Sequence, residues 1–236
     1  MKIIGCETLH CDAGWRNFSF LKLLTNDGHI GISEYNESYG SKGLTAVIEA
    51  LVEAVTGDDP CRHELVSQKL YAMTRQAHGG LNQQAIAAIE NAMLDIKAKS
   101  LNVPVYELLG GAIRTELPLY WSHCGTYRMS EENSKTMGRR HFTKLDDLVE
   151  LGAEVRERGF KALKTNIFLF NEDPNRHFPG FARGPGWPEL NADKRLIDAL
   201  RAQLTAFRDG GGPDMGILLD LNFNFKTEGY LQICRG

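Results

Sequence analysis

The chain has 236 residues, of which 42% are hydrophobic and 24% are charged, enough to form one or two domains with a core. A formal net charge of −3 argues against binding to nucleic acid or to an anionic membrane surface. Five scattered cysteines, no signal peptide and no long apolar run predict a cytoplasmic protein with free thiols and no membrane span.

The N-terminal part of the chain predicts an antiparallel sheet followed by helices. A strand over residues 18–24 leads through the turn Asn26-Asp27-Gly28 into a partner strand over 30–35. Apolar residues at helical spacing then predict three helices, over 44–55, 65–73 and 81–101. Pro104 starts a short helical turn that Gly110 and Gly111 end.

After residue 114 the pattern changes to an alternation of strands and helices. The expected strands are 117–121, 160–164 and 216–221, and the expected helices are 145–158, 192–207 and 228–234. Repeated βα units form parallel sheets, so we expect an α+β domain over 1–114 and an α/β domain over 115–236. Three βα units are too few to close a barrel, which takes eight strands.

Two connections in the second domain are longer than a compact fold needs. Residues 126–142 carry several basic side chains, and residues 167–189 mix aromatic residues, prolines and basic groups. Loops after barrel strands carry specificity, so 167–189 could be a lid or a subunit contact. A surface insertion that packs its own aromatic residues explains the composition equally well.

Pairs of polar residues end two of the expected strands. Lys164 and Asn166 end one, and Asp220 and Asn222 end the next. Residues two apart on a strand project to the same side, and a carboxylate at such a strand end suits a hard cation such as Mg²⁺. A lysine near that cation would be biased toward its neutral form, which favours work as a base. Strand ends also carry polar residues simply because they meet solvent.

Several strings, together with the order of the domains, resemble the enolase superfamily, in particular its mandelate racemase/muconate-lactonizing branch. The strings are Ala87-Ala88-Ile89-Glu90-Asn91-Ala92-Met93-Leu94-Asp95-Ile96-Lys97-Ala98-Lys99, Val103-Pro104-Val105-Tyr106-Glu107-Leu108-Leu109-Gly110-Gly111, Lys164-x-Asn166 and Asp220-x-Asn222. The resemblance implies an α+β capping domain followed by the first βα units of a (β/α) TIM-like barrel, which is incomplete in this chain.

The resemblance also implies roles for the residues at the strand ends. Asp220 matches the first of three acidic Mg²⁺ ligands, Asn222 matches a polar position facing the substrate, and Lys164 matches the first lysine of a Lys-x-Lys base motif. Asn166 departs from that motif, because it stands where the family has its second lysine. Asparagine cannot abstract a proton at neutral pH, so we expect Asn166 to orient a substrate or intermediate by hydrogen bonds.

The departure at Asn166 favours one reaction over others in the family. A racemase with one base on each face of the substrate fits poorly, whereas a sugar-acid dehydratase fits better. Such an enzyme removes the proton α to a carboxylate, with Mg²⁺ stabilising the enediolate, and expels the β-hydroxyl. A racemase, epimerase or cycloisomerase of the same superfamily, or a non-catalytic short form used for binding or assembly, are the alternatives. The partners expected are an acid sugar and, in a complete protein, further copies of the chain.

Three further residues are candidates for substrate contact. Trp15 and Arg16 lie between the first two strands, where the family has a loop over the substrate; Arg16 could meet a carboxylate, and Trp15 could exclude water. His123 follows the first barrel strand and could line the mouth. An exposed turn, for the loop, and a structural hydrogen bond, for His123, explain these residues as well. Asp95, within the long helix, is expected to make a structural hydrogen bond.

Overall fold

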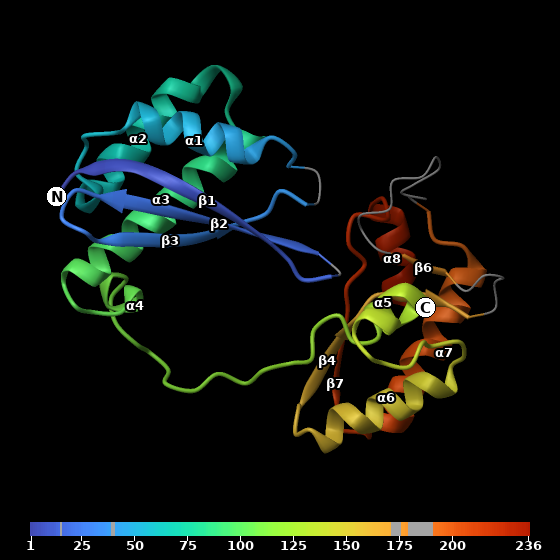
Figure 1. The fold of residues 1–236 in the computed structure, drawn as a ribbon. Helices are drawn as coiled ribbons and strands as arrows, with labels where there is room; N and C mark the ends of the chain where they lie inside the picture. The colour runs from blue at the N-terminus through green and yellow to red at the C-terminus, as the bar shows by residue number, and fades with distance from the viewer. Residues whose placement is uncertain (15, 39–40, 171–175, 179–190) are drawn as a thin grey trace. The chain divides into compact units, whose positions relative to one another are not determined.

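The computed structural model describes residues 1–14, 16–38, 41–170, 176–178 and 191–236. These residues form two compact units, Met1–Thr115 and Glu116–Gly236 (Figure 1). Within the described residues, the first unit buries a single apolar cluster, whereas the second buries two. None of the helices in the described part of the chain is long and apolar enough to cross a bilayer.

The first unit begins with the expected antiparallel sheet. Its strands are β1 (Ile3–Asp12), β2 (Asn17–Thr25) and β3 (Ile30–Tyr35), in the order β1-β2-β3. Every second residue of β2 from Ser19 onward is buried, because successive side chains of a strand point to opposite faces. The turn after β2 is closed by Thr25, whose hydroxyl donates to the His29 carbonyl at 2.7 Å.

Helices cover one face of this sheet (Figure 1). They are α1 (Leu44–Ala54), α2 (His63–Thr74), α3 (Gly80–Ser100) and the short α4 (Val105–Leu108), with 3₁₀ turns η1 (Pro60–Arg62) and η2 (Arg75–Ala77). Helix α3 buries Ile86, Ile89, Met93 and Ile96, the residues whose spacing predicted it. The core of the first unit therefore lies between α1, α3 and the sheet.

Gly31 lets β3 lie directly against α3. A Cβ atom added to Gly31 would come within 2.0 Å of the Ala92 carbonyl oxygen, so no other side chain fits there. Next to this contact, the Asp95 carboxylate accepts a hydrogen bond from the Ile32 amide at 2.8 Å and pairs with Lys99 at 2.6 Å. The structural hydrogen bond expected of Asp95 is thus confirmed.

The second unit contains two parallel strands that alternate with helices. Strand β4 (Ala162–Thr165) pairs with β7 (Gly216–Leu219). Helix α6 (Asp146–Glu157) precedes β4, helix α7 (Lys194–Gly211) precedes β7, and helix α8 (Thr227–Arg235) follows β7. This is the order of strands and helices with which a (β/α) barrel begins.

The strand expected to end at Trp121 is reduced to a single bridge. The Trp121 amide donates to the Ala162 carbonyl at 3.0 Å, and the Trp121 carbonyl accepts from the Lys164 amide at 2.8 Å. Leu117 and Leu119 are each 71% exposed, so this segment does not bury alternate side chains in a core. The prediction was wrong because alternation alone does not show whether a partner strand lies alongside.

Helices α6 and α7 pack closely because both carry glycine at the contact. A Cβ atom on Gly210 would lie 1.9 Å from the Val149 carbonyl oxygen, and one on Gly152 would lie 2.8 Å from the Phe207 carbonyl oxygen. Helix α7 continues to Gly211, beyond the end predicted at Phe207. Gly210 lies inside this helix, and its lack of a Cβ atom allows the close contact with Val149.

Both long connections contain regular structure. Residues Thr126–Met129 form the 3₁₀ turn η3, and Glu131–Thr136 form α5. Strand β5 (Ile167–Leu169) follows β4 after one residue and pairs antiparallel with β6 (Arg176–Phe178). Much of the segment predicted as a lid or subunit contact, namely residues 171–175 and 179–189, lies outside the described residues.

Candidate functional site

Lys164 and Asp220 meet at the carboxyl ends of the two parallel strands. Lys164 lies on β4, Asp220 directly follows β7, and Lys164 Nζ is 3.3 Å from Asp220 Oδ2. The side chains are 24% and 32% exposed, so a ligand from solvent can reach both. Lys164 Nζ also lies 5.7 Å from the centre of the Tyr120 ring, within the range of a cation–π contact.

The main chain of Asp220 is held on both sides. Its amide donates to the Thr165 carbonyl at 2.9 Å, and its carbonyl accepts from Asn166 Nδ2 at 3.1 Å. Both bonds join the end of β7 to the end of β4. The position of the carboxylate is therefore anchored through the backbone, while its oxygens remain partly accessible.

Asn222 lies in a turn rather than on a strand. Strand β7 ends at Leu219, and Asn222 has a left-handed φ of 51°. The Asn222 amide donates to Asp220 Oδ1 at 3.0 Å, as in an Asx turn. The expectation that Asp220 and Asn222 project from one face of a strand was wrong because the strand is shorter than predicted, yet the two residues are in contact.

Asn166 lies in the single-residue gap between β4 and β5 and is 3% exposed. Its Oδ1 accepts from the Thr126 hydroxyl at 2.7 Å, and its Nδ2 donates to the Asp220 carbonyl at 3.1 Å. Lys164 and Asn166 thus both reach Asp220, one through its carboxylate and the other through its main chain.

His123 is exposed and has a left-handed φ of 50°. Its carbonyl accepts from the Thr126 amide at 3.0 Å, and its ring lies 5.5 Å from the ring of Tyr127. These contacts show how His123 shapes the turn after Trp121. A contact of its side chain with substrate remains a prediction.

Of the two candidate substrate contacts in the first unit, Trp15 and Arg16, the structure describes only Arg16. Trp15 lies outside the described residues. Arg16 pairs with the Glu34 carboxylate at 3.6 Å, and its guanidinium lies 4.1 Å from the centre of the Phe18 ring. Arg16 therefore meets a carboxylate of its own unit, and a contact with substrate stays a prediction.

Cys124 is buried close to the site but is not poised as a nucleophile. Its amide donates to the Lys164 carbonyl at 2.7 Å. Burial, and secondarily the negative charge of Glu154, raise the pKa of the Cys124 thiol to about 12. The thiol is therefore protonated at neutral pH, and the nucleophilic form is the thiolate.

Three residues that support the site were not predicted from the sequence: Tyr120, Thr126 and Gln203. Gln203 is fully buried on α7 and lies on the same face as Leu196, Leu200 and Phe207, with steps of four, three and four residues from Leu196 to Phe207. A glutamine on such a face is a detectable signal, because a buried amide needs hydrogen-bond partners. Thr126 and Tyr120 offer no comparable signal in the sequence.

The Asp220 carboxylate fits one ligand position of a hard cation. It is partly exposed and keeps free lone pairs beside its contacts with Lys164 and Asn222. Among the described residues, no group of three metal-ligating side chains forms around Asp220. The described part of the chain thus offers Asp220 as a single ligand and not a complete cation site.

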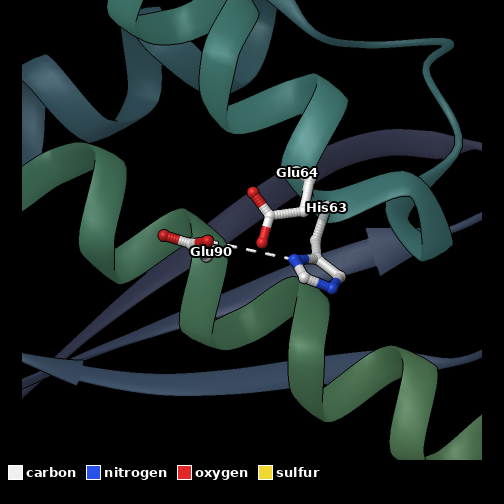
Figure 2. Close-up of side chains that lie close together, drawn as sticks. All are labelled: His63, Glu64 and Glu90. Carbon is white, nitrogen blue, oxygen red and sulfur yellow. Dashed lines mark ion pairs between the residues drawn. The ribbon is translucent and has the colours of Figure 1, made fainter. Parts of the chain in front are cut away.

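A separate group of ligand-type side chains lies in the first unit. Figure 2 shows His63 and Glu64, at the start of α2, beside Glu90 of α3, and their ligand atoms lie within 4.8 Å of one another. His63 Nδ1 is 3.9 Å from Glu90 Oε1. Glu64 is exposed, and exposed acidic groups often lie close together without a metal, so we assign no metal here.

Comparison with known proteins now identifies the family. Residues 11–110 match the N-terminal domain of the mandelate racemase/muconate lactonizing enzyme family. The chain belongs to the mandelate racemase/muconate-lactonizing branch of the enolase superfamily. The first unit is accordingly the α+β capping domain of that family, and the second contains the first βα units of its barrel.

Curated relatives include dehydratases. The D-galactonate dehydratase family member RspA of Cellvibrio japonicus is 27% identical over 231 residues, which cover 94% of this chain and 53% of that protein. The D-galactonate dehydratase of Xanthomonas euvesicatoria is 38% identical over 120 residues, 51% of this chain and 31% of that protein. The chain thus spans about half, or less, of the length of these curated relatives.

A solved structure carries the name of a different reaction. The "putative L-alanine-DL-glutamate epimerase" from Burkholderia xenovorans is 49% identical, with a TM-score of 0.92 over 100% of this chain and 59% of that one. A second structure of that protein, with a TM-score of 0.91 and matching 99% of this chain and 58% of that one, is bound to magnesium and fumarate. The family therefore includes proteins named for both dehydration and epimerisation.

Proposed function

We propose that Lys164 and Asp220 belong to the active site of a Mg²⁺-dependent sugar-acid dehydratase. The observation that carries the proposal is the 3.3 Å contact between Lys164 Nζ and Asp220 Oδ2 at the carboxyl ends of adjacent parallel strands, where barrel enzymes place their sites. The relatives named D-galactonate dehydratase support the reaction. The structure with magnesium and fumarate, a dicarboxylate, supports the cation and an acid ligand.

Each of the two residues has a role in this proposal. Asp220 would hold the cation as one carboxylate ligand, and Lys164 would donate hydrogen bonds to an anionic group of the acid or, when neutral, accept a proton. Bound Mg²⁺ would stabilise the negative charge that develops on the substrate carboxylate after loss of the α-proton. The proposed substrate contacts are Asn222, Arg16, Trp15 and His123. We also propose that the complete protein is cytoplasmic and forms a homo-oligomer.

The activity is proposed for a protein that joins this chain to the rest of the barrel. The chain covers 53% of RspA and 59% of the Burkholderia xenovorans structure, and around Asp220 the described residues offer a single ligand. We therefore expect residues 1–236 alone to bind Mg²⁺ weakly and to leave sugar acids unchanged. Rapid dehydration of an acid sugar by residues 1–236 would contradict this part of the proposal.

The ligand role of Asp220 is tested by Mg²⁺ titration calorimetry on three proteins. Replacing Asp220 by asparagine should weaken Mg²⁺ binding by at least about tenfold, because hard cations prefer a charged carboxylate. Asp214→Asn is the matched control, since Asp214 is exposed and lies before β7, at the other end of the strand from Asp220. Equal weakening in both variants, or in neither, would remove Asp220 from the proposed site.

Epimerisation is the second candidate, because the 49% identical structure is named for it. The two reactions are separated by incubating acid sugars with Mg²⁺ in D₂O and the protein that carries this chain within a full barrel. A dehydratase gives a product lighter by one water, whereas an epimerase gives inversion and deuterium at the α-carbon with no loss of water. Inversion without dehydration across a panel of acid sugars would overturn the first proposal.

A further inference from the structure

A buried network of polar side chains adjoins the Lys164–Asp220 pair. Its members are Thr126, Thr165, Asn166 and Gln203, and each is at most 8% exposed. We call these four side chains the strand-end network, because they lie at the ends of β4 and β7 and on the elements that pack there. Buried polar groups of this kind persist where they are hydrogen-bonded, and all four are.

Gln203 hydrogen-bonds to the backbone where the chain passes from β4 through Asn166 into β5. Its Nε2 donates to the Asn166 carbonyl at 2.6 Å and to Thr165 Oγ1 at 3.1 Å, and its Oε1 accepts from the Phe168 amide at 2.9 Å. Without Gln203, the Asn166 carbonyl and the Phe168 amide would need another hydrogen-bond partner. Gln203 thereby fixes the backbone path at which β4 passes into β5.

The side chain of Asn166 then joins this path to its neighbours. Thr126 donates to its Oδ1 at 2.7 Å, and its Nδ2 donates to the Asp220 carbonyl at 3.1 Å. The hydroxyl of Thr126 therefore determines which way the amide faces, and the amide in turn holds the main chain of Asp220. The network links the turn after Trp121 to the ends of both strands.

We infer that Asn166, Thr126 and Gln203 are positioning residues that fix Asp220, and that Asn166 itself does not contact substrate. Both ends of the Asn166 amide bond to the protein, and 3% exposure leaves almost no surface for a ligand. The Asp220 carboxylate, in contrast, is 32% exposed. The inference rests on the proposed function only in taking Asp220 as the group that binds the cation.

The first test measures the binding of Mn²⁺, a paramagnetic probe, to residues 1–236. Thr126→Val keeps the shape but loses the hydroxyl, whereas Thr126→Ser keeps the hydroxyl. We expect Thr126→Val and Gln203→Glu to weaken Mn²⁺ binding about tenfold, the usual loss when a group behind a metal ligand is removed. Thr126→Ser should bind as the unchanged chain does. Phe207→Leu, at a buried site on the same helix as Gln203, controls for lost stability.

The second test needs no metal. Main-chain and side-chain amide signals in ¹⁵N NMR spectra report on Asp220 and Asn166 directly. In Thr126→Val, the Asp220 amide and the Asn166 side-chain signals should shift and exchange faster with solvent, and Thr126→Ser should restore them. Phe207→Leu should leave both unchanged.

The outcomes separate the inference from the proposed function. Undisturbed Asp220 signals in Thr126→Val would overturn the inference, as would an equal loss of Mn²⁺ binding in Phe207→Leu. If Thr126→Val shifts the Asp220 signals but Asp220→Asn leaves Mn²⁺ binding unchanged, the positioning role is supported and the metal-binding proposal is contradicted.

Discussion

The two units pack in the same way but bury different polar groups. In each, glycine brings a backbone against a helix: Gly31 against Ala92 in the first unit and Gly210 against Val149 in the second. Within the described residues, the buried polar side chains of the first unit are the hydroxyls Ser19, Thr25 and Ser33. Those of the second unit include the amides Asn166, Gln203 and Asn224 and the carboxylate Asp147.

This difference shows where the chain uses hydrogen bonds to specify structure. Hydroxyls on a sheet can satisfy themselves at nearby backbone groups, as Thr25 does at the His29 carbonyl. A buried amide or carboxylate needs several partners held in fixed positions, and it disrupts the fold if one is lost. The second unit therefore gains a defined site at its strand ends and becomes more sensitive to single polar substitutions.

The largest effect should come from packing, and it should be the same in both units. Gly31→Ala and Gly210→Ala each place a Cβ about 2 Å from a carbonyl oxygen, so we expect each to lower the free energy of unfolding by about 2 to 3 kcal/mol. Replacing glycine by alanine in a helix normally stabilises it, so a loss of stability in Gly210→Ala would be due to the close contact with Val149. Urea denaturation measures both, with Asp209→Ala, at an exposed neighbour, as the control.

A stabilising Gly210→Ala would mean that α6 and α7 can separate without loss. The packing of the second unit would then be looser than that of the first. In that case the two units would no longer share close packing through a glycine.

The next effect should appear in the second unit alone. Asp147 accepts from the Thr143 amide at 2.7 Å and the Lys144 amide at 3.1 Å, and pairs with Arg140 at 3.1 Å, while its side chain is 3% exposed. Asp147→Ala leaves these groups without their acceptor, so we expect a loss of about 2 kcal/mol in urea denaturation.

Its neighbour provides the control. The Asp146 side chain is 74% exposed and pairs with Lys144 at the surface, so Asp146→Ala should change stability by at most about 0.5 kcal/mol. Similar losses in the two variants would show that burial of the carboxylate does not matter, and the contrast between the units would weaken.

Sequence patterns predicted those parts of the molecule that local rules determine. The spacing of Ile86, Ile89, Met93 and Ile96 predicted α3, because a buried helix face repeats every three to four residues. Strand ends carrying Lys164 and Asp220 predicted a shared site, because parallel strands end at one edge of a sheet. Both arguments use only the geometry of one element and its repetition.

Two of the three wrong or missing predictions, those at Leu117 and Leu119 and at Gln203, share a physical cause, which is dependence on partners distant in sequence. Leu117 and Leu119 alternate like strand residues, but no strand in the described chain pairs with them. Asn222 follows a strand pattern, but β7 ends at Leu219, and Asp220 then forms a turn with Asn222. Gln203 hydrogen-bonds to Asn166, 37 residues away, and no local pattern gives that distance.

The smallest effect concerns Glu37, which caps a helix of the first unit near its surface. Its carboxylate accepts from the Gly43 amide at 2.6 Å and the Thr45 amide at 3.3 Å, beside the start of α1, and from the Thr45 hydroxyl. Partial burial raises the pKa of Glu37, but these hydrogen bonds outweigh it, so the pKa lies below its ordinary value of 4.5. A lowered pKa means that the charged form is preferred by the folded state.

The stability that Glu37 contributes should therefore be present above a pH of about 4.5 and be lost as the pH falls through the lowered pKa. Glu37→Gln should cost about 0.5 kcal/mol near neutral pH, at the low end for a capping group, and flatten this part of the pH profile. Melting temperatures between about pH 3 and pH 7 measure this, with Glu53→Gln, at an exposed site on α1, as the control. A loss at Glu37 as large as that at Asp147 would show that the first unit also depends on a carboxylate, and the contrast between the two units would then rest on the amides alone.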